Sequence, residues 1–405
     1  MLKSKASSNA TDQRNITRLR VLEKIRARGA ISRIDIASAL ETSPATITSA
    51  TADLLSAGLI EEIESETPSK SARRGRPRVQ LKLNGASHLI AGVKVARQQV
   101  SVILVDFEGT AITSYTHPLD QARMAPDAFA AKIRAVLDQA CASANRSLAD
   151  LSGVCIGIAG LIDANQNFVH WSSSLTERNV DLSPLLSKVL PCPAFIENDA
   201  NLVAKAEQLF GLGKGLKNFL VVTIEHGIGL GIVLDGKLYR GERGCGAEFG
   251  HTKVQLDGAL CRCGQRGCLE AHVGDYALLR EANIRGSAQP EDDLSVLYAR
   301  AKAGDAMARS IFDRAGRMFA MGLANVINIF DPSLVILSGE QMSFDFLYSS
   351  DVLNTVKSSV VQVDAPLPEI RVHKWGDLMW AKGAAACAME GVSELTIRNL
   401  GADAA

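Results

Sequence analysis

From residue 88 onward, segments with strand character alternate with segments of helix character, and this alternation limits the possible folds most strongly. The stretches LSGVCIGIAGLID, residues 151–163, and NFLVVTIEHGIGLGIVLDG, residues 218–236, are apolar and interrupted by glycines, as buried strands are. Residues 128–144 and 305–329 instead have helical periodicity. Strands alternating with helices indicate an α/β fold, in which binding sites form where strands end.

The length and the cysteine pattern indicate a multidomain protein of the cytoplasm. A chain of 405 residues exceeds what one hydrophobic core usually organises, so two or three domains are expected. No run approaches the roughly 18 apolar residues of a membrane span, and the first residues lack an apolar signal core. Five of the eight cysteines are scattered without a paired spacing, which favours free thiols in a reducing compartment. They are Cys141, Cys155, Cys192, Cys245 and Cys387.

The formal net charge of zero conceals two halves of opposite sign. Residues 1–85 contain 15 Lys and Arg against 9 Asp and Glu, whereas the rest of the chain contains 29 against 35. A basic N-terminal module on an acidic body is typical of a protein whose small end meets a polyanion. Nucleic acid is the leading candidate.

Residues 14–85 have the pattern of a winged helix-turn-helix. Apolar residues recur every three positions in 15–28, which predicts a helix that Gly29 ends. Ser32 is placed to cap a second short helix, and Ser43 followed by Pro44 is a start signal for a third. The segment GLIEEIESETPSKSARRGRPRVQLKLN then predicts two strands around a polar loop, which is a wing.

The third helix and the wing supply the expected DNA contacts. The helix presents short hydroxyl side chains and no Arg, Asn or Gln for bidentate contacts with bases, so base recognition should be modest. The arginines of RRGRPR suit the narrow minor groove of A·T-rich DNA. The predicted DNA-binding residues are Ser43, Thr46, Thr48, Ser49, Arg73, Arg74 and Arg76. The alternative is a three-helix interaction module with a solvated basic loop. Residues 1–13 are polar and without periodicity, so disorder is expected there.

Three cysteines and a histidine gather within residues 248–270, EFGHTKVQLDGALCRCGQRGCLE. Cys261, Cys263 and Cys268 follow the spacing C-x-C-x4-C, and His251 lies ten residues upstream. Three thiolates and one imidazole complete a tetrahedron, the composition of a structural zinc site without an open position for water. The alternatives are free cysteines, a disulfide or a catalytic zinc.

Residues 88–395 resemble the ROK family of repressors and sugar kinases, which has a two-lobed actin-like ATPase fold. The resemblance rests on IENDANLVAKAEQLFG, on GIGLGIVLDGKLYRG, and on GAEFGHTKV followed by CRCGQRGCLE. With the winged helix, the chain resembles the family's sugar-responsive regulators, the class of the xylose and N-acetylglucosamine repressors. The expected fold class is therefore α/β, with an N-terminal winged helix-turn-helix and a two-lobed body. The expected divisions are 1–13 disordered, 14–85 winged helix, 86–200 first lobe, 201–395 second lobe with the zinc clip, and 396–405 tail.

The resemblance implies a sugar site, whose residues are Asn198, Asp199, Glu248, His251 and Glu270. Asp199 matches the general base of the kinases, and His251 would bind zinc with one nitrogen and face sugar with the other. The segment WSSSL, residues 171–175, lies where the family contacts sugar. Without the family, an Asn-Asp pair after a strand is more often a turn or a helix cap, and Glu248 and Glu270 could merely support the metal clip.

Three segments depart from the kinase pattern for binding ATP. Lys94, Ala96 and Arg97 replace the carboxylate and glycines expected in the first phosphate loop, and Glu225-His226 occupies the second. Ser338-Gly339-Glu340 lacks the usual glycine pair near the adenosine position. We therefore expect no catalytic residues and no enzyme activity. A sugar kinase with a DNA-binding module and a regulator controlled by a protein partner are the alternatives.

These patterns together predict a DNA-binding transcriptional regulator, expected to be a repressor of carbohydrate-metabolism genes. Its expected effector is a sugar or sugar phosphate, and its expected cofactor is structural Zn2+. The expected DNA partner is a pseudo-palindromic, A·T-rich double-stranded operator bound by a homodimer or homotetramer. A membrane partner is not expected.

Overall fold

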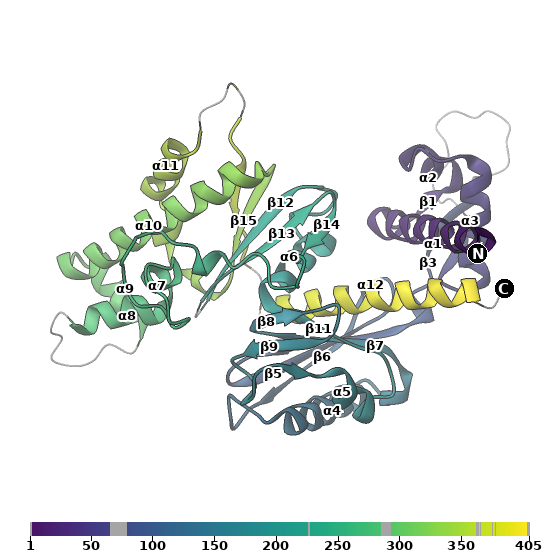
Figure 1. Cartoon of the computed structure of the whole chain (residues 1–405), viewed down its shortest axis with the longest axis horizontal. Helices are drawn as coiled ribbons and strands as arrows, with labels where there is room; N and C mark the ends of the chain where they lie inside the picture. The colour runs from purple at the N-terminus through teal and green to yellow at the C-terminus, as the bar shows by residue number, and fades with distance from the viewer. Residues whose placement is uncertain are drawn as a thin grey trace. The chain divides into compact units, whose positions relative to one another are not determined.

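The N-terminal segment folds as a winged helix-turn-helix, as its sequence predicts. The computed structural model describes residues 2–402 apart from 65–78, 226, 285–292, 362, 363, 365, 375 and 377. The elements of the winged helix are α1 (Leu2–Arg28), β1 (Ile31–Ser32), α2 (Arg33–Ala39), α3 (Pro44–Ser56), β2 (Ile60–Glu64) and β3 (Val79–Leu83). The strands form a small antiparallel sheet in the order β1-β3-β2 (Figure 1).

Local hydrogen bonds start the two helices of the helix-turn-helix where the sequence predicts. The Ser32 side chain accepts from the Asp35 backbone N–H, and the Ser43 side chain accepts from that of Thr46. Each bond satisfies a donor that the first helical turn leaves free. Helix α1 begins at Leu2, within the segment 1–13 for which the sequence predicts disorder. Its segment contains neither proline nor glycine, so nothing in it interrupts a helix.

Asp53 fastens the third helix to the first. Its carboxylate accepts from Arg18 at 2.7 Å and from Arg14 at 2.8 Å, and the two arginines hold the pKa of Asp53 below its usual range despite an opposing desolvation. Asp53 is a charged residue of a helix whose buried face is apolar apart from Thr51, so helical spacing alone would leave its carboxylate facing solvent. The charges of α1 turn its carboxylate inward instead.

The chain forms two compact units. Unit 1 comprises Met1–Ile158, Gln166–Glu197 and Ala384–Ala405, and unit 2 comprises Ala159–Asn165 and Asn198–Gly383. None of the described helices combines the length and apolar character that spanning a bilayer requires.

In unit 1 a mixed five-stranded sheet, in the order β11-β7-β4-β5-β6, follows the winged helix. Its strands are β4 (Leu89–Val95), β5 (Gln99–Val105), β6 (Ala111–Pro118), β7 (Leu151–Ile158) and β11 (Ala194–Asn198). Helices α4 (Pro126–Ser143) and α5 (Ser183–Val189) lie on one face, and helix α12 (Met379–Ala402) lies on the other, drawn in yellow in Figure 1. The shorter elements are η1 (Gly85–Ser87), η2 (Leu148–Asp150), β9 (Phe168–Ser172) and β10 (Val180–Asp181).

Unit 2 is built on a second five-stranded sheet, in the order β14-β13-β12-β15-β16. The strands are β12 (Phe219–Ile224), β13 (Ile228–Leu234), β14 (Lys237–Tyr239), β15 (Leu334–Ser338) and β16 (Glu369–Val372), and β8 (Gly160–Asp163) belongs to the same unit. The helices are α6 (Asp199–Phe210), α7 (Glu270–Val273), α8 (Asp275–Ile284), α9 (Leu294–Lys302), α10 (Ala306–Phe330) and α11 (Ser350–Ser359). The 3-10 turns are η3 (Phe249–His251), η4 (Glu340–Ser343) and η5 (Asp345–Leu347).

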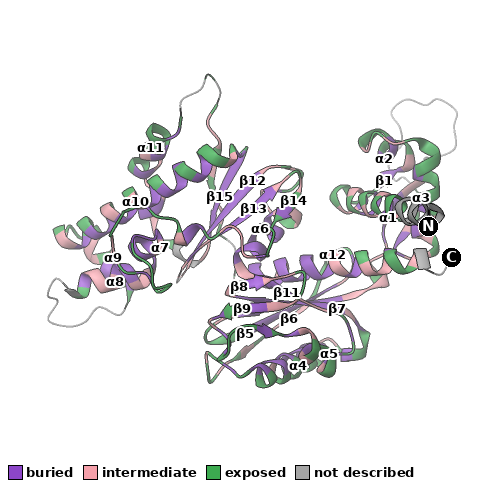
Figure 2. Cartoon of the chain, in the orientation of Figure 1, coloured by how far each residue is buried: buried purple, intermediate pink, exposed green. Residues whose placement is uncertain are grey.

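Strand β12 is apolar apart from Thr223 because both faces of this sheet are covered. Leu220 and Val222 pack in one core cluster with α10, whereas Phe219 and Val221 pack in another with α6 and the start of α12. Figure 2 shows the central strands of this sheet in the colour of buried residues. Burial on both faces explains why the sequence has continuous apolar runs here without polar alternation.

Helix α12 makes the division into units differ from the linear boundaries that the sequence predicts. The second lobe was expected to span 201–395 and the tail 396–405, but residues from Ala384 onward belong to unit 1. Within that unit, Val392 lies against Gly153 of β7, and Gly391 lies against Phe195 of β11. Residues 396–402, which were expected in the tail, are therefore the last turns of this helix.

The last turns of α12 also complete the core of the winged helix. Ile397 is fully buried in the cluster that contains Leu22 and Ile25 of α1 and Phe107 of the turn between β5 and β6. Arg26 of α1 lies over the Phe107 ring, 5.1 Å from its centroid. The winged helix thus shares one hydrophobic core with the lobe that follows it.

We predict that Ile397→Ala destabilises unit 1 by about 2–4 kcal/mol, because it leaves a cavity in this shared core. Chemical denaturation measures the loss, and operator binding should weaken as the winged helix loosens. Asn399→Ala, a change at an exposed position two residues on, is the matched control. Equal stability of the two variants would contradict the shared core.

Candidate metal and sugar site

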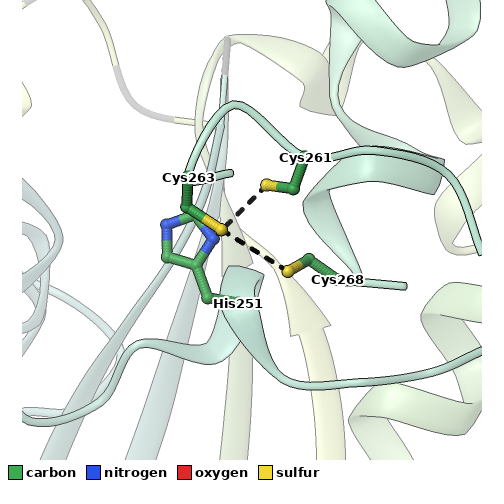
Figure 3. Close-up of side chains that lie close together, drawn as sticks. All are labelled: His251, Cys261, Cys263 and Cys268. Atoms are coloured by element: carbon green, nitrogen blue, oxygen red, sulfur yellow. Dashed lines mark hydrogen bonds between the residues drawn. The ribbon is translucent and has the colours of Figure 1, made fainter. Parts of the chain in front are cut away.

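Four predicted metal ligands converge on one point of unit 2. Ligand atoms of His251, Cys261, Cys263 and Cys268 all lie within 4.8 Å of one another, and Figure 3 shows the four side chains pointing inward. The Sγ atoms of Cys263 and Cys268 are 3.7 Å apart, and Cys261 Sγ is 3.6 Å from His251 Nδ1. A tetrahedral zinc with Zn–S bonds of about 2.3 Å would separate two sulfurs by about 3.8 Å. The cluster therefore has the composition and spacing of a structural zinc site.

Tight turns bring these ligands together. The backbone of Cys261 donates to Gln265 O, and a bridge between Leu260 and Arg266 closes the turn that carries the middle cysteine. Gly267 has a φ of +75°, and a β carbon there would lie 1.8 Å from the Gln255 carbonyl oxygen. Only glycine fits at that position, so the spacing between the cysteines depends on it.

Lys253 contacts the metal clip, the segment 251–268 that carries the four predicted ligands. The sequence pattern did not reveal this contact. Its Nζ donates to Cys268 Sγ at 2.9 Å and to Gln265 Oε1 at 2.6 Å. The sulfur contact raises the pKa of Lys253. An ammonium group beside a thiolate stabilises the form of cysteine that binds a metal. A bridge between Lys253 and Cys268 brings the two residues together, although they are fifteen positions apart in the chain.

His251 faces in two directions. Its Nδ1 is the nitrogen near Cys261, whereas its Nε2 lies 3.9 Å from Glu248 Oε2. The ring can thus offer one nitrogen to a metal and turn the other toward the predicted sugar residues. Its position in turn η3, between Glu248 and the start of the clip, produces this arrangement.

Glu248 lies in a concentration of negative charge. Two fifths of its side chain is exposed, yet its surroundings desolvate the carboxyl and, with Asp199 and Glu270, raise its pKa to about 7. Desolvation is the largest cause, and the two carboxylates add repulsion. Glu270 begins α7, and its Oε1 lies 3.9 Å from Cys261 Sγ. The predicted sugar carboxylates therefore belong to one electrostatic cluster beside the metal ligands.

Asn198 and Asp199 lie where strand β11 passes into helix α6. Asn198 is the N-cap of α6: its Oδ1 accepts from the Ala200 backbone N–H, and its Nδ2 donates to Gly160 O. Asn198 thus acts as a helix cap, which is the structural alternative to a sugar contact for this residue. Asp199 is the first residue of α6, where the positive end of the helix dipole favours a carboxylate. The segment WSSSL belongs to unit 1, and its Ser172 and Ser174 are buried.

In the segments that depart from the kinase pattern, polar groups form hydrogen bonds within the protein. At the turn between β4 and β5, the Ala96 backbone donates to Gln99 O. At the turn between β12 and β13, the Glu225 backbone donates to Gly227 O, and His226 lies outside the described residues. The buried Ser338 at the end of β15 donates its hydroxyl to His373 O.

The predicted DNA-facing residues of α3 are exposed. Ser43, Thr46, Thr48 and Ser49 all lie on the surface, while Ile47 of the same helix is buried. The wing arginines Arg73, Arg74 and Arg76 lie outside the described residues, between strands β2 and β3. A helix with a hydroxyl-lined outer face beside a β-hairpin is the geometry of a major-groove reader with a wing.

Comparisons with known proteins identify the family of the body. Residues 90–390 match the sequence model of the ROK family, which covers well over half of the chain. The chain belongs to the ROK family. Residues 15–67 match the MarR family, in agreement with the winged helix.

Similar proteins over most of the chain are transcriptional regulators. The xylose repressor of Bacillus spizizenii (strain ATCC 23059 / NRRL B-14472 / W23) is 29% identical over 84% of this chain and 85% of its own length. The DNA-binding transcriptional dual regulator NagC of Escherichia coli (strain K12) is 28% identical over 77% of each chain. A crystal structure of a ROK family transcriptional regulator, a homologue of the E. coli MLC protein, superimposes with a TM-score of 0.80. It is 26% identical and covers 97% of this chain and 99% of its own.

This ROK protein is thus a transcriptional regulator that resembles known repressors, although sugar kinases share the fold of its body. A ROK hexokinase from Thermus thermophilus matches 74% of this chain and 97% of its own at 27% identity, with a TM-score of 0.65. The four-residue cluster could hold a metal such as zinc.

We predict that the purified protein contains one zinc per chain and that Cys263→Ser lowers this content after dialysis against a mild chelator. Serine is a poor zinc ligand, so only three good ligands remain to hold the ion. Cys263 is exposed, so its replacement disturbs little packing. Elemental analysis measures zinc, and Cys245→Ser controls for loss of a cysteine outside the cluster. Full zinc retention in Cys263→Ser would contradict the assignment.

Proposed function

We propose that this protein is a repressor of carbohydrate-metabolism genes that binds operator DNA and responds to a sugar or sugar phosphate, without phosphorylating it. The observation that carries the proposal is the winged helix packed in one core with the first lobe of a ROK body. Relatives named as repressors align with most of the chain. Their names point to xylose and N-acetylglucosamine as the first effectors to test.

The proposed sugar residues are Asn198, Asp199, Glu248, His251 and Glu270. Carboxylates and an imidazole suit sugar hydroxyl groups, which donate and accept hydrogen bonds at fixed angles. Asn198 can serve in two ways, since its amide already orients the start of α6 and thereby Asp199. All five residues belong to unit 2. Their location in the same unit supports the proposal that all five bind the same sugar molecule.

The proposed cofactor is a structural Zn2+ held by His251, Cys261, Cys263 and Cys268. Such an ion would fix the His251 ring, so that the nitrogen nearer Glu248 keeps one direction. No step of sugar chemistry is assigned to the metal, because four protein ligands leave no open position. The role of the ion is to hold the wall of the sugar site in shape.

The proposed DNA contacts are Ser43, Thr46, Thr48 and Ser49 on α3, with Arg73, Arg74 and Arg76 on the wing. Hydroxyl groups make short contacts with phosphates and base edges, and arginines in a narrow minor groove favour A·T-rich sequence. A homodimer or homotetramer would present two such modules to a pseudo-palindromic operator. The effector controls this binding only if its affinity differs between the DNA-bound and free conformations.

The loss of ATP-binding features supports a binding role over catalysis. Lys94 and Glu225 stand where the kinase pattern has a carboxylate and a glycine, and the acid at Glu225 would repel an approaching phosphate. Ser338 uses its hydroxyl within the protein. Asp199 would therefore bind a sugar hydroxyl group but would not act as the general base of a phosphoryl transfer.

We predict that Arg76→Ala weakens operator binding and lowers the slope of log K against log salt by about 1, since one phosphate contact is lost. Binding is measured by fluorescence anisotropy at several salt concentrations. Arg309→Ala, at an exposed position of α10, provides the control for loss of one positive charge. An unchanged slope for Arg76→Ala would remove this residue from the DNA contacts.

We predict that at least one of D-xylose, N-acetyl-D-glucosamine, D-glucose and their phosphates raises the melting temperature, because a ligand of the native state alone stabilises it. Asp199→Asn should reduce this rise, while Asp313→Asn, an exposed control on α10, should retain it. A coupled assay with ATP and the same sugars should show no turnover. Turnover that depends on Asp199 would instead establish a kinase.

A further inference from the structure

Tyr276 stands between the metal clip and a wall of the proposed sugar site. It is the second residue of α8, and its hydroxyl lies 3.3 Å from Glu270 Oε1 and 3.7 Å from Cys261 Sγ. One side chain thus contacts a predicted metal ligand and a predicted sugar ligand. Neither the cysteine spacing nor the family motifs single out this tyrosine.

The clip itself holds the tyrosine ring. The Arg262 guanidinium, between two of the cysteines, lies 3.9 Å from the centre of the Tyr276 ring. A second arginine, Arg280 of α8, donates to the backbone oxygens of Leu260 and Ala271. A cation over an aromatic face is attractive, and these bonds join α8 to both ends of the clip. The position of the ring therefore depends on the shape of the clip.

The hydroxyl group has one proton to donate, and the carboxylate is its better acceptor. Glu270 Oε1 is nearer than Cys261 Sγ, and a carboxylate oxygen accepts more strongly than sulfur. The geometry therefore assigns the single O–H of Tyr276 to Glu270.

The second oxygen of Glu270 is confined as well. A β carbon on Gly227, in the turn between β12 and β13, would lie 2.6 Å from Glu270 Oε2. The carboxylate thus has Tyr276 at one oxygen and bare backbone at the other. A group held from both sides loses little freedom when a ligand arrives, which favours binding.

We propose that Tyr276 is a positioning residue that orients Glu270 toward the sugar and makes that orientation depend on the metal clip. This inference rests on the proposed function. It adds a path from clip to sugar, through Arg262, Tyr276 and Glu270, that is separate from the shared ring of His251. The hydroxyl acts through Glu270 and does not itself contact the sugar.

The test is a double-mutant cycle in the full-length, zinc-loaded protein. Tyr276→Phe removes the hydroxyl and keeps the ring under Arg262, and it is compared with Glu270→Ala and with the double variant. Calorimetry measures the Kd of whichever sugar among D-xylose, N-acetyl-D-glucosamine and D-glucose binds the wild type most tightly. Elemental analysis measures zinc, and Tyr239→Phe, at an exposed tyrosine of β14, is the matched control.

We expect Tyr276→Phe to keep one zinc per chain and to raise Kd about tenfold, the size of one hydrogen bond to a charged group. In the Glu270→Ala background the same change should leave Kd unaltered, because the group that it orients is gone. Three results would overturn the inference: an unchanged Kd in Tyr276→Phe, an equal loss in both backgrounds, or loss of zinc. Failure of every sugar to bind the wild type would refute the proposed function, and the inference with it.

Discussion

The candidate site of unit 2 depends on the close approach of three cysteine sulfurs and one imidazole, whose ligand atoms lie within 4.8 Å of one another. Within that cluster, His251 directs Nδ1 inward and Nε2 toward Glu248, so a single ring borders both groups of residues. The glycine at position 267 permits the approach of the chain that this packing needs. If the cluster loosened, the carboxylates around it would lose the framework that sets their directions. A metal in such a place is structural in its effect even where it borders a binding surface.

Negative charge is the second theme of the site. Desolvation, together with the charges of Asp199 and Glu270, raises the pKa of Glu248 to about 7. A kinase would offset such a cluster with a metal-bound nucleotide, but here the neighbouring turn contributes a further acid, Glu225. The proposed site offers side chains suited to sugar hydroxyl groups, and the sequence lacks the carboxylate and glycines that the kinase pattern has for phosphate. In the proposed regulator, binding without transfer is the consequence.

How much of this could be read from the sequence depends on the range of the interactions. The caps Ser32 and Ser43 were predictable because each bonds a backbone group three residues away. The metal cluster was predictable because its spacing is local and its chemistry narrow. The contacts of Asp53 with α1 and of Lys253 with Cys268 were not, since they depend on how distant segments pack. The sugar and DNA contacts stay predictions, and the wing arginines lie outside the described residues.

The burial of Ile397 among residues of α1 has a consequence for how such proteins are assembled from modules. Although the winged helix occupies the first part of the chain, its core is completed by the last helix, so the module is discontinuous in sequence. Suppose that genetic exchange between relatives replaced only the N-terminal segment. The new winged helix would then have to pack against an α12 from a different protein, and its core would no longer match that helix. A stable winged helix in this chain therefore depends on two segments that are far apart in the sequence, α1 and α12.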